Sequence, residues 1–237
     1  MTKALLRLYL RKTLILFNRL VYRRFYYRRQ FDGDIVEQFH RFYYDSYVWQ
    51  DATCWLGIAT EKCPTDLWVY QEIIYQTKPS VIIECGTAQG GSALFLASMC
   101  DLMNSGKVLT IDIKDEVGRP RHPRIEYLIG SSTSREIVRR IEESLDGKDK
   151  VMVILDSNHT KEHVLNELRT YSRFVTKGNY LIVEDTNVNG HPVFPEHGPG
   201  PLEAVSEFLK ETKDFVADRD REKFFLTFSP NGYLRKR

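Results

Sequence analysis

The chain has 237 residues, of which 42% are hydrophobic and 28% are charged. This composition is ordinary for one globular domain with an appendage rather than for a disordered chain. The net charge is +2, but residues 1–31 hold nine Lys or Arg and no acid, so residues 32–237 carry −7. The four cysteines form no C-x-x-C pair, which excludes the common zinc patterns and favours a reduced, cytoplasmic setting.

Apolar and basic residues are interleaved through residues 1–31. Charges recur too often for a membrane span, which needs about 20 mostly apolar residues. No alanine between Ala4 and Ala52 provides a small-residue cleavage site for a signal peptide. One interpretation is a helix on the inner, anionic face of a membrane, as a peripheral contact. The alternative is a helix that packs on the domain or on another subunit of a homo-oligomer, with its basic residues solvated. Nucleic acid is not the expected partner.

Residues 32–64 are polar and aromatic, and we expect them to be irregular. Thr65 or Asp66 is predicted to cap a helix that ends before Pro79. Large aromatic residues in this region could line a substrate pocket, but their spacing is more typical of a core. They are Trp55, Trp68 and Tyr70.

A glycine-rich turn follows an apolar stretch that begins at Val81. Residues 81–92 read V-I-I-E-C-G-T-A-Q-G-G-S, and the apolar run that follows predicts a helix. In a parallel α/β sheet such a turn lies at the carboxyl end of a strand, where glycines let backbone N–H groups approach a cofactor. The spacing differs from the dinucleotide pattern G-x-G-x-x-G and resembles motif I of class I S-adenosylmethionine (SAM) dependent methyltransferases. The cofactor-binding candidates in this turn are Glu84, Gly86, Thr87, Gly90, Gly91 and Ser92.

Two further strands are predicted at residues 108–113 and 125–129. Asp112 ends the first of them, about 20 residues beyond the glycine turn, and is placed to accept hydrogen bonds from ribose hydroxyls. Ser131 and Ser132 follow the second and are candidates for the adenine end of the cofactor site, although serines also cap helices. The basic loop at residues 119–124 is expected to be solvated.

Carboxylates collect after the next two predicted strands, residues 151–155 and 180–183. Asp156 follows the first strand, and Glu184 and Asp185 follow the second. The repeated alternation of strands and helices predicts a doubly wound, mostly parallel α/β sheet whose strands end at one shared edge. Three acids there would repel one another unless a cation neutralised them, and an all-oxygen site suits Mg²⁺ or Mn²⁺. The alternative is that the acids cap the following segments or pair with Lys or Arg.

Two histidines are candidates for a general base acting on a hydroxyl. His159, three residues after Asp156, is the first candidate, and His191 in the loop after Asp185 is the second. A lone histidine is as often a packed or capping residue, so both roles stay open.

The last part of the chain is predicted to finish the sheet. Pro201 can begin a helix. Residues 223–228 and 233–235 are predicted to form a hairpin, because Asn231-Gly232 favours a tight turn between them.

Three stretches carry a family resemblance. They read D-S-N-H-T at residues 156–160, Y-L-I-V-E-D-T-N-V-N-G at residues 180–190 and G-P-G-P at residues 198–201. In this combination the chain resembles the cephalosporin hydroxylase family, which includes rhamnosyl O-methyltransferases. The family name suggests a hydroxylase, but a non-haem iron hydroxylase would require a histidine followed two residues later by an acid. No histidine of this chain has an acid at that position, so we do not expect hydroxylase activity.

The resemblance runs from about Trp55 to Tyr233 and implies a class I methyltransferase fold, Rossmann-like with a seven-stranded sheet, with SAM bound at the first glycine turn. We expect this domain to cover residues 51–237, preceded by a helical, basic and aromatic extension at residues 1–50. The basic segment before about Asp32 is not part of the shared pattern. Asp156 is a further candidate for contact with SAM. A divalent ion would lie on acids equivalent to Asp156, Glu184 and Asp185.

We therefore expect a SAM-dependent, divalent-metal-assisted O-methyltransferase that acts on a hydroxyl of a rhamnose-like sugar in a glycolipid or polysaccharide. Two alternatives remain. The acceptor could be a small phenolic or antibiotic natural product, or the chain could be a non-catalytic glycan-binding scaffold with the same fold.

Overall fold

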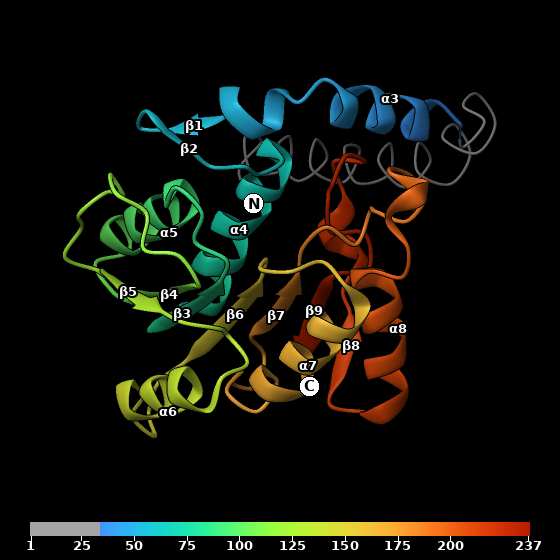
Figure 1. Ribbon diagram of the computed structural model, residues 1–237. Coiled ribbons are helices and arrows are strands. Elements are labelled where there is room, and N and C mark those ends of the chain that lie inside the picture. Colours follow the sequence, from blue (N-terminus) through green and yellow to red (C-terminus); the bar gives the residue numbers. More distant parts are fainter. Residues whose placement is uncertain (1–33) are drawn as a thin grey trace, which may run out of the picture. The chain divides into compact units, whose positions relative to one another are not determined.

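The computed structural model describes residues 34–237 of the chain (Figure 1). Two compact units divide the chain, Met1–Phe42 and Tyr43–Arg237. The first unit is described only from residue 34, where helix α3 (Asp34–Asp45) begins. The basic segment at residues 1–31, with its predicted membrane contact, lies outside the described residues. No helix within residues 34–237 is long and apolar enough to cross a membrane.

A seven-stranded sheet forms the centre of the second unit. Its strands are β3 (Val81–Cys85), β4 (Lys107–Asp112), β5 (Ile125–Ile129), β6 (Val151–Leu155), β7 (Tyr180–Val183), β8 (Phe215–Ala217) and β9 (Tyr233–Lys236). Their order across the sheet is β5-β4-β3-β6-β7-β9-β8. The first five in this order are parallel, and β9 runs antiparallel to both β7 and β8. The predicted class, a mostly parallel seven-stranded α/β sheet, is confirmed.

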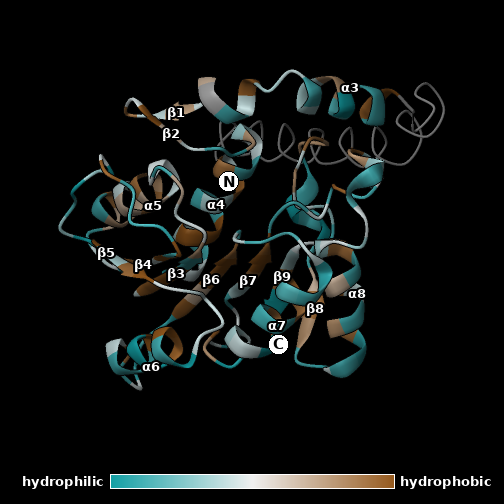
Figure 2. Cartoon of the chain, viewed as in Figure 1, coloured by the Kyte–Doolittle hydropathy of each residue, from teal (hydrophilic) through white to brown (hydrophobic). Residues whose placement is uncertain are grey.

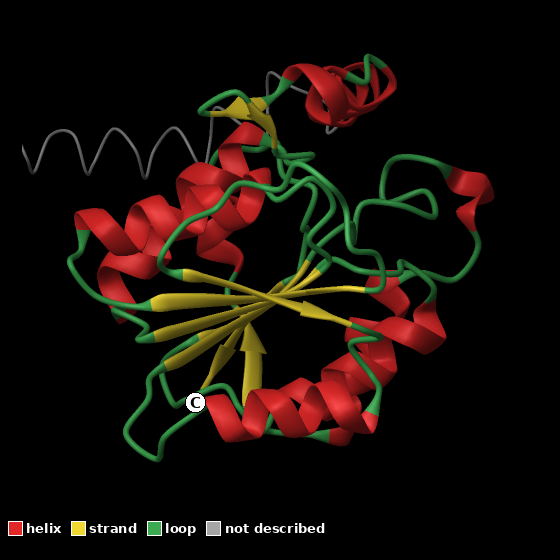
Figure 3. Cartoon of the chain, turned by 60° about the vertical axis from the view of Figure 1, so that its left-hand side comes forward, coloured by secondary structure: helices red, strands yellow, loops and turns green. Residues whose placement is uncertain are grey.

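Helices cover both faces of this sheet (Figure 3). One face packs against α4 (Pro64–Thr77) and α5 (Gly91–Leu102). The other packs against α6 (Arg135–Ser144), α7 (Lys161–Tyr171) and α8 (Pro201–Glu211). Because both faces are covered, the inner strands are mostly apolar. Every residue of β3 and β6 is buried, including Glu84 near the end of β3. Figure 2 shows this as a hydrophobic sheet between helices with hydrophilic outer residues.

The direction in which strands are added reverses between the neighbours β3 and β6. The chain runs from β3 to β4 and β5, and it then returns through α6 to place β6 on the other side of β3. Ligands of open α/β sheets bind at such a switch point, beyond the carboxyl ends of the strands. Here the loops that flank this point begin with Gly86 and Asp156, and the Asp156 N–H donates to the Cys85 carbonyl oxygen at 2.7 Å.

The expectation of irregular structure for residues 32–64 is wrong over its described part. Helix α3 is followed by a π-helical turn, η2 (Val48–Ala52), and by a hairpin of β1 (Cys54–Trp55) and β2 (Ile58–Ala59). Aromatic packing holds the segment, since Trp49 and Tyr44 both lie edge-on against Phe228. Phe228 is remote in sequence, so the local residue pattern could not show this support.

The predicted C-terminal hairpin is also wrong in its first strand. β9 pairs with β8, and residues 223–228 contain no strand. The Phe228 N–H donates to Asp66 Oδ2 at 2.8 Å, so this segment bonds to α4 instead of to a neighbouring strand. Asn231 and Gly232 do form a turn before β9.

Helix α4 also differs in detail from its prediction. It begins at Pro64 with Cys63 in the capping position, so neither Thr65 nor Asp66 is the cap. Tyr70 lies in the core as expected, whereas Trp68 is 60% exposed.

Asp66 predicts a measurable pH dependence of stability. Its carboxylate is buried and accepts hydrogen bonds from the Phe228 N–H and the Tyr233 hydroxyl, both at 2.8 Å. Burial raises the pKa of Asp66 from 3.8 to about 6. Because the folded state holds the proton more tightly than the unfolded state, this residue's contribution to stability is greatest below about pH 4 and falls as the pH rises to about 6.

We expect Asp66→Asn to remove this pH-dependent loss of stability. For a pKa raised from 3.8 to about 6, the loss in the free energy of unfolding is about 3 kcal/mol. Denaturant unfolding between pH 4 and pH 7 measures it as the difference from the wild type. The same change at exposed Asp115 should leave the pH profile as it is. Identical profiles for Asp66→Asn and the wild type would contradict the assignment.

Candidate active site

A cavity of about 370 Å³ lies at the carboxyl ends of β3, β4 and β5. We call it the β4 cavity. Its lining residues are Gly86, Ala88, Ile111, Asp112, Ile113, Lys114, Glu116, Gly130, Ser131, Ser132, Ser157, Asn158 and His163. Four residues that the sequence singled out as cofactor contacts therefore share one wall; they are Gly86, Asp112, Ser131 and Ser132.

Gly86 is the point at which the loop after β3 meets the end of β6. Its φ of +100° lies in the region that favours glycine, and a Cβ atom here would lie 1.8 Å from the Asp156 carbonyl oxygen. Any side chain at this position would push the two loops apart. The sequence predicts that the glycine lets the backbone approach a cofactor, whereas the close approach in the structure is to the backbone of Asp156.

Asp112 organises the glycine turn. Its Oδ2 atom accepts hydrogen bonds from the backbone N–H groups of Thr87 at 3.2 Å and Ala88 at 2.9 Å. The Arg119 guanidinium lies 3.1 Å from the same oxygen, and its side chain is 6% exposed. The expectation that the whole basic loop at residues 119–124 is solvated is therefore wrong for Arg119, which secures Asp112 against the turn.

The remaining cofactor-binding candidates of the glycine turn do not line the β4 cavity. Glu84 is fully buried and accepts a hydrogen bond from the Thr110 hydroxyl at 2.7 Å. The Thr87 hydroxyl bonds to the same Thr110 hydroxyl at 2.7 Å. A Cβ atom on Gly91 would lie 2.1 Å from the Ala59 carbonyl oxygen, and Ser92 is buried. Gly90 precedes α5 with a left-handed φ of +84°. These residues shape the turn.

A second cavity, of about 280 Å³, adjoins the first. We call it the carboxylate cavity, because Asp156 and Asp185 line it. The two cavities share four lining residues, namely Gly86, Ala88, Asp112 and Ser157. The others in the carboxylate cavity are Tyr44, Trp49, Gln50, Ala59, Thr60, Glu61, Lys62, Thr87, Ser92, Asp156, His159 and Asp185. A ligand in one cavity would thus lie beside a ligand in the other.

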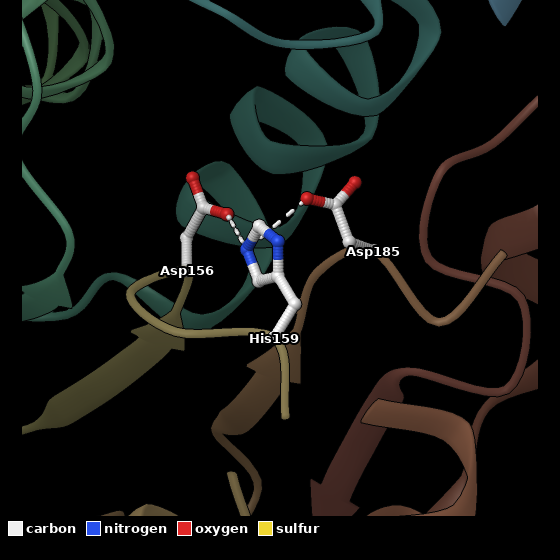
Figure 4. Close-up of side chains that lie close together, drawn as sticks. All are labelled: Asp156, His159 and Asp185. Atoms are coloured by element: carbon white, nitrogen blue, oxygen red, sulfur yellow. Dashed lines mark hydrogen bonds and ion pairs between the residues drawn. The ribbon is translucent and has the colours of Figure 1, made fainter. Parts of the chain in front are cut away.

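Two aspartates and a histidine converge in the carboxylate cavity (Figure 4). The Nε2 atom of His159 lies 3.3 Å from Asp156 Oδ1 and 3.2 Å from Asp185 Oδ2. One ligand atom from each of the three residues lies within 4.8 Å of the others, which is a spacing that could hold a metal ion. Burial alone would lower the pKa of His159, but the negative charges of Asp185 and Asp156 raise it to about 9. The ring is thus the counter-ion of the two carboxylates.

Glu184, the third predicted metal ligand, faces a different group. Its Oε1 atom accepts a hydrogen bond from the Tyr70 hydroxyl at 2.8 Å and lies 3.1 Å from Lys62 Nζ. Lys62 also forms an ion pair with Asp156. Burial would lower the pKa of Lys62, but Asp156 and Glu184 raise it well above its usual value. This lysine is therefore a fixed positive charge between two strand ends.

Sequence reasoning missed Lys62. The residue stands between the β1–β2 hairpin and α4, and its side chain is 2% exposed. Lysine is almost always exposed unless paired, and the acids that pair with it lie more than 90 positions later in the chain. No local pattern could have shown the contact.

His191 and His163 bond to groups other than Asp156, Glu184 and Asp185. His191, the second candidate base, has its Nε2 atom 2.8 Å from Glu203 Oε1, at the start of α8. It is not among the residues that line either cavity. His163 lines the β4 cavity, where its Nε2 atom lies 3.1 Å from the Ser157 hydroxyl.

Solved structures share this arrangement of strands and helices. The chain is similar to a CmcI structure with Mg and SAM, with a TM-score of 0.61 and 20% identity, covering 79% of this chain and 77% of that one. It is also similar to the O-methyltransferase TomG from Streptomyces achromogenes in complex with SAM, with a TM-score of 0.51 and 16% identity, covering 82% and 86%. The sheet order, with both cavities at its carboxyl edge, is that of the class I methyltransferase fold.

Sequence comparison narrows this class to one family. The pattern of the rhamnosyl O-methyltransferase/CmcI family matches residues 47–237. The rhamnosyl O-methyltransferase of Mycobacterium leprae is 42% identical over 210 residues, which are 84% of this chain and 90% of that protein. The protein of the same name from Mycobacterium bovis is 40% identical over 209 residues, 84% of each chain. This chain belongs to the rhamnosyl O-methyltransferase/CmcI family, so the predicted resemblance is confirmed.

Lys62 gives a prediction for stability. Lys62→Met keeps most of the side-chain volume but leaves the buried carboxylates of Asp156 and Glu184 without their shared cation. Removing one partner of a buried ion pair costs about 3–5 kcal/mol, so we expect a loss of this size in the free energy of unfolding.

Lys161→Met is the matched control. Lys161 lies 2.7 Å from Glu207 in a pair whose side chains are 38% and 41% exposed, and loss of such a pair costs at most about 1 kcal/mol. Equal effects of the two variants in denaturant unfolding would contradict the role given to Lys62.

Proposed function

We propose that this chain transfers a methyl group from SAM to a hydroxyl of a rhamnose-like sugar, with the help of a divalent cation. The observation that carries the proposal is the junction of the two cavities at Gly86, which sets the β4 cavity beside the Asp156, His159 and Asp185 cluster. The name that the M. leprae and M. bovis relatives share supports the acceptor class. The CmcI and TomG structures that hold SAM support the methyl donor.

The residues of the β4 cavity fit an adenosine-like donor. Its volume of about 370 Å³ lies in the range of ligand pockets, about 300–1,000 Å³. The Asp112 carboxylate stands on the wall for ribose hydroxyls, and the hydroxyls of Ser131 and Ser132 stand farther along it. We assign Glu84, Thr87, Gly90, Gly91 and Ser92 an indirect part, because they shape the turn that carries Gly86.

The aspartates of the carboxylate cavity fit a divalent cation. Asp156 and Asp185 offer oxygen atoms that meet at His159 Nε2, and oxygen donors suit Mg²⁺. Glu184 remains a predicted ligand, but its bonds to Tyr70 and Lys62 suit it better to holding Asp156 in place through Lys62.

When bound, the ion lowers the pKa of an acceptor hydroxyl, and SAM supplies an electrophilic methyl group. His159 Nε2 takes the proton of that hydroxyl in our proposal. The two carboxylates are the reason for its raised pKa, so a cation held by Asp156 and Asp185 would offset their charge and leave the ring nitrogen able to accept a proton. Gly86 and Asp112 set the distance between the two ligands, because both residues line both cavities.

The proposed function predicts metal-dependent turnover. The purified chain is expected to methylate methyl α-L-rhamnoside with labelled SAM when Mg²⁺ or Mn²⁺ is present, and EDTA should abolish the product. Calorimetry should detect SAM binding to the same preparation. Absence of SAM binding, both with and without Mg²⁺, would refute the proposal that the chain is a SAM-dependent methyltransferase.

The other outcomes identify the alternatives. Methylation of phenols but not of rhamnosides would indicate a small natural product as the acceptor. Binding of glycans without any turnover would indicate a non-catalytic scaffold.

His159 gives a second prediction for this activity. We expect His159→Ala to lower kcat by about 10²- to 10⁴-fold, the usual contribution of a general base, and to leave the affinity for SAM close to that of the wild type. The affinity for Mg²⁺ should not fall, because the variant loses a cationic group that pairs with the same two carboxylates. His191→Ala, which removes the histidine bonded to Glu203, should keep its activity. A loss of Mg²⁺ affinity in His159→Ala, measured by calorimetry, would show that the ring is a metal ligand instead.

The basic segment at residues 1–31 extends the proposal to the site of action. Its nine Lys or Arg without an acid suit a peripheral contact with anionic lipid, where each basic residue near the surface contributes about 1 kcal/mol. This would bring the enzyme to a glycolipid acceptor at the cytoplasmic face. A homo-oligomer is also part of the proposal.

A further inference from the structure

One wall of the carboxylate cavity is aromatic. Tyr44, from the last turn of α3, and Trp49 and Gln50, from η2, line the cavity together with His159 and Asp185. We call Tyr44, Trp49 and Gln50 the acceptor wall. The wall stands on the same cavity as the proposed proton acceptor.

The rings of the acceptor wall are held in fixed positions. The Trp49 Nε1–H donates to the Tyr44 carbonyl oxygen at 2.8 Å. The two rings are stacked, with centroids 5.3 Å apart and an interplanar angle of 22°. Phe228 supports both with edge-on contacts, at 5.4 Å from Trp49 and 5.6 Å from Tyr44. The wall is therefore organised before a ligand arrives, which lowers the entropic cost of binding.

The backbone of this segment is also unusual. η2 is a π-helical turn, and Tyr47 immediately before it has a φ of +55°. π-Helical turns are rare and frequent at functional sites, and a left-handed tyrosine costs free energy that the surrounding structure must offset. The packing on Phe228 keeps the strained turn in place and thereby keeps Trp49 in the cavity.

The chemistry of the cavity selects one kind of acceptor. Fixed aromatic rings offer an apolar contact surface, and the Gln50 amide and the carboxylates offer hydrogen-bond partners beside it. The charges of Asp156 and Asp185 are already paired with Lys62 and His159, so the acceptor need not supply a charge. The carboxylate cavity has a volume of about 280 Å³, which is near the lower limit of ligand pockets, about 300 Å³. A cavity of this size encloses one sugar ring rather than a whole glycan.

We infer that the acceptor wall of Tyr44, Trp49 and Gln50 binds a single neutral deoxy-sugar ring by its apolar face and sets the specificity for the acceptor. This inference rests on the proposed function and names the residues that choose its substrate. The remainder of the glycan or glycolipid lies outside the cavity, so a simple methyl rhamnoside contains the part that is recognised.

The test is a kinetic comparison of variants at Trp49. Trp49→Leu is expected to raise the KM for methyl α-L-rhamnoside by about tenfold or more, as truncation of a buried aromatic anchor does. The affinity for S-adenosylhomocysteine, measured by calorimetry, should not change, because Trp49 does not line the β4 cavity. Trp49→Phe keeps a ring but loses the bond to the Tyr44 carbonyl, so its KM should lie between the two.

Matched variants separate the wall from general effects on the fold. Trp68→Leu removes a tryptophan that is 60% exposed on α4 and should keep the wild-type KM. Gln50→Ala, a smaller change in the same wall, should raise KM without lowering the melting temperature. Wild-type KM in both Trp49→Leu and Gln50→Ala, or a fall in kcat alone, would overturn the inference.

A binding measurement separates this inference from the proposed function. Saturation-transfer NMR with methyl α-L-rhamnoside and S-adenosylhomocysteine-loaded protein should detect the sugar on the wild type and on His159→Ala but not on Trp49→Leu. Sugar binding of this pattern without any turnover would refute methyl transfer and support sugar binding by the acceptor wall. Equal binding of the sugar to the wild type and to Trp49→Leu would refute sugar binding by the acceptor wall, even if the enzyme were active.

Discussion

A balance of buried charge at the ends of β6 and β7 underlies the rest of the site. Asp156, Glu184 and Asp185 lie close together, and two cationic groups face them. Lys62 bridges Asp156 and Glu184, and His159 bridges Asp156 and Asp185. Asp156 belongs to both bridges, so its position depends on both cations. Charges in low-dielectric surroundings are tolerated only when they are paired in this way.

The two bridges differ in what can replace them. Lys62 is enclosed, with 2% of its side chain exposed, whereas the His159 side chain is 32% exposed at the carboxylate cavity. Under the proposed function, a cation from solution would therefore meet Asp156 on its His159 side, where the side chain is more exposed. The Lys62 charge would remain part of the fold, and the His159 charge would be the one that a bound cation replaces.

The periodicity of apolar residues is sufficient to predict the five parallel strands of the central sheet, because parallel strands covered on both faces form continuous apolar runs. It does not predict β8. The strands at residues 125–129, 151–155 and 180–183 have the predicted bounds. The same logic placed Asp112, Asp156 and Asp185 at one edge, since parallel strands end together. Features that depend on contacts remote in sequence could not be predicted. Lys62 can be buried only because it pairs with Asp156. The aromatic ring of Trp49 in the η2 turn is supported by Phe228.

Local sequence patterns predict the wrong structure where contacts between residues remote in sequence determine the fold. Asn231-Gly232 suggested a hairpin, but the chain before it bonds to Asp66. The predicted boundary at residue 51 set Tyr44 and Trp49 in the extension, although the family match begins at residue 47 and both residues line the carboxylate cavity. Asp112 is predicted to bind the ribose of a ligand. In the structure its carboxylate accepts hydrogen bonds from two backbone N–H groups of the glycine turn.

The wall shared by the two cavities has a thermodynamic consequence. Gly86, Ala88, Asp112 and Ser157 belong to both, so a ligand that orders this wall from one side alters the surface that a second ligand meets from the other. Any such coupling is reciprocal, since the factor by which the first ligand changes the affinity of the second must equal the factor for the reverse order. If both cavities bind ligands as proposed, the glycine turn after β3 couples the two binding equilibria, because Gly86 and Ala88 line both cavities.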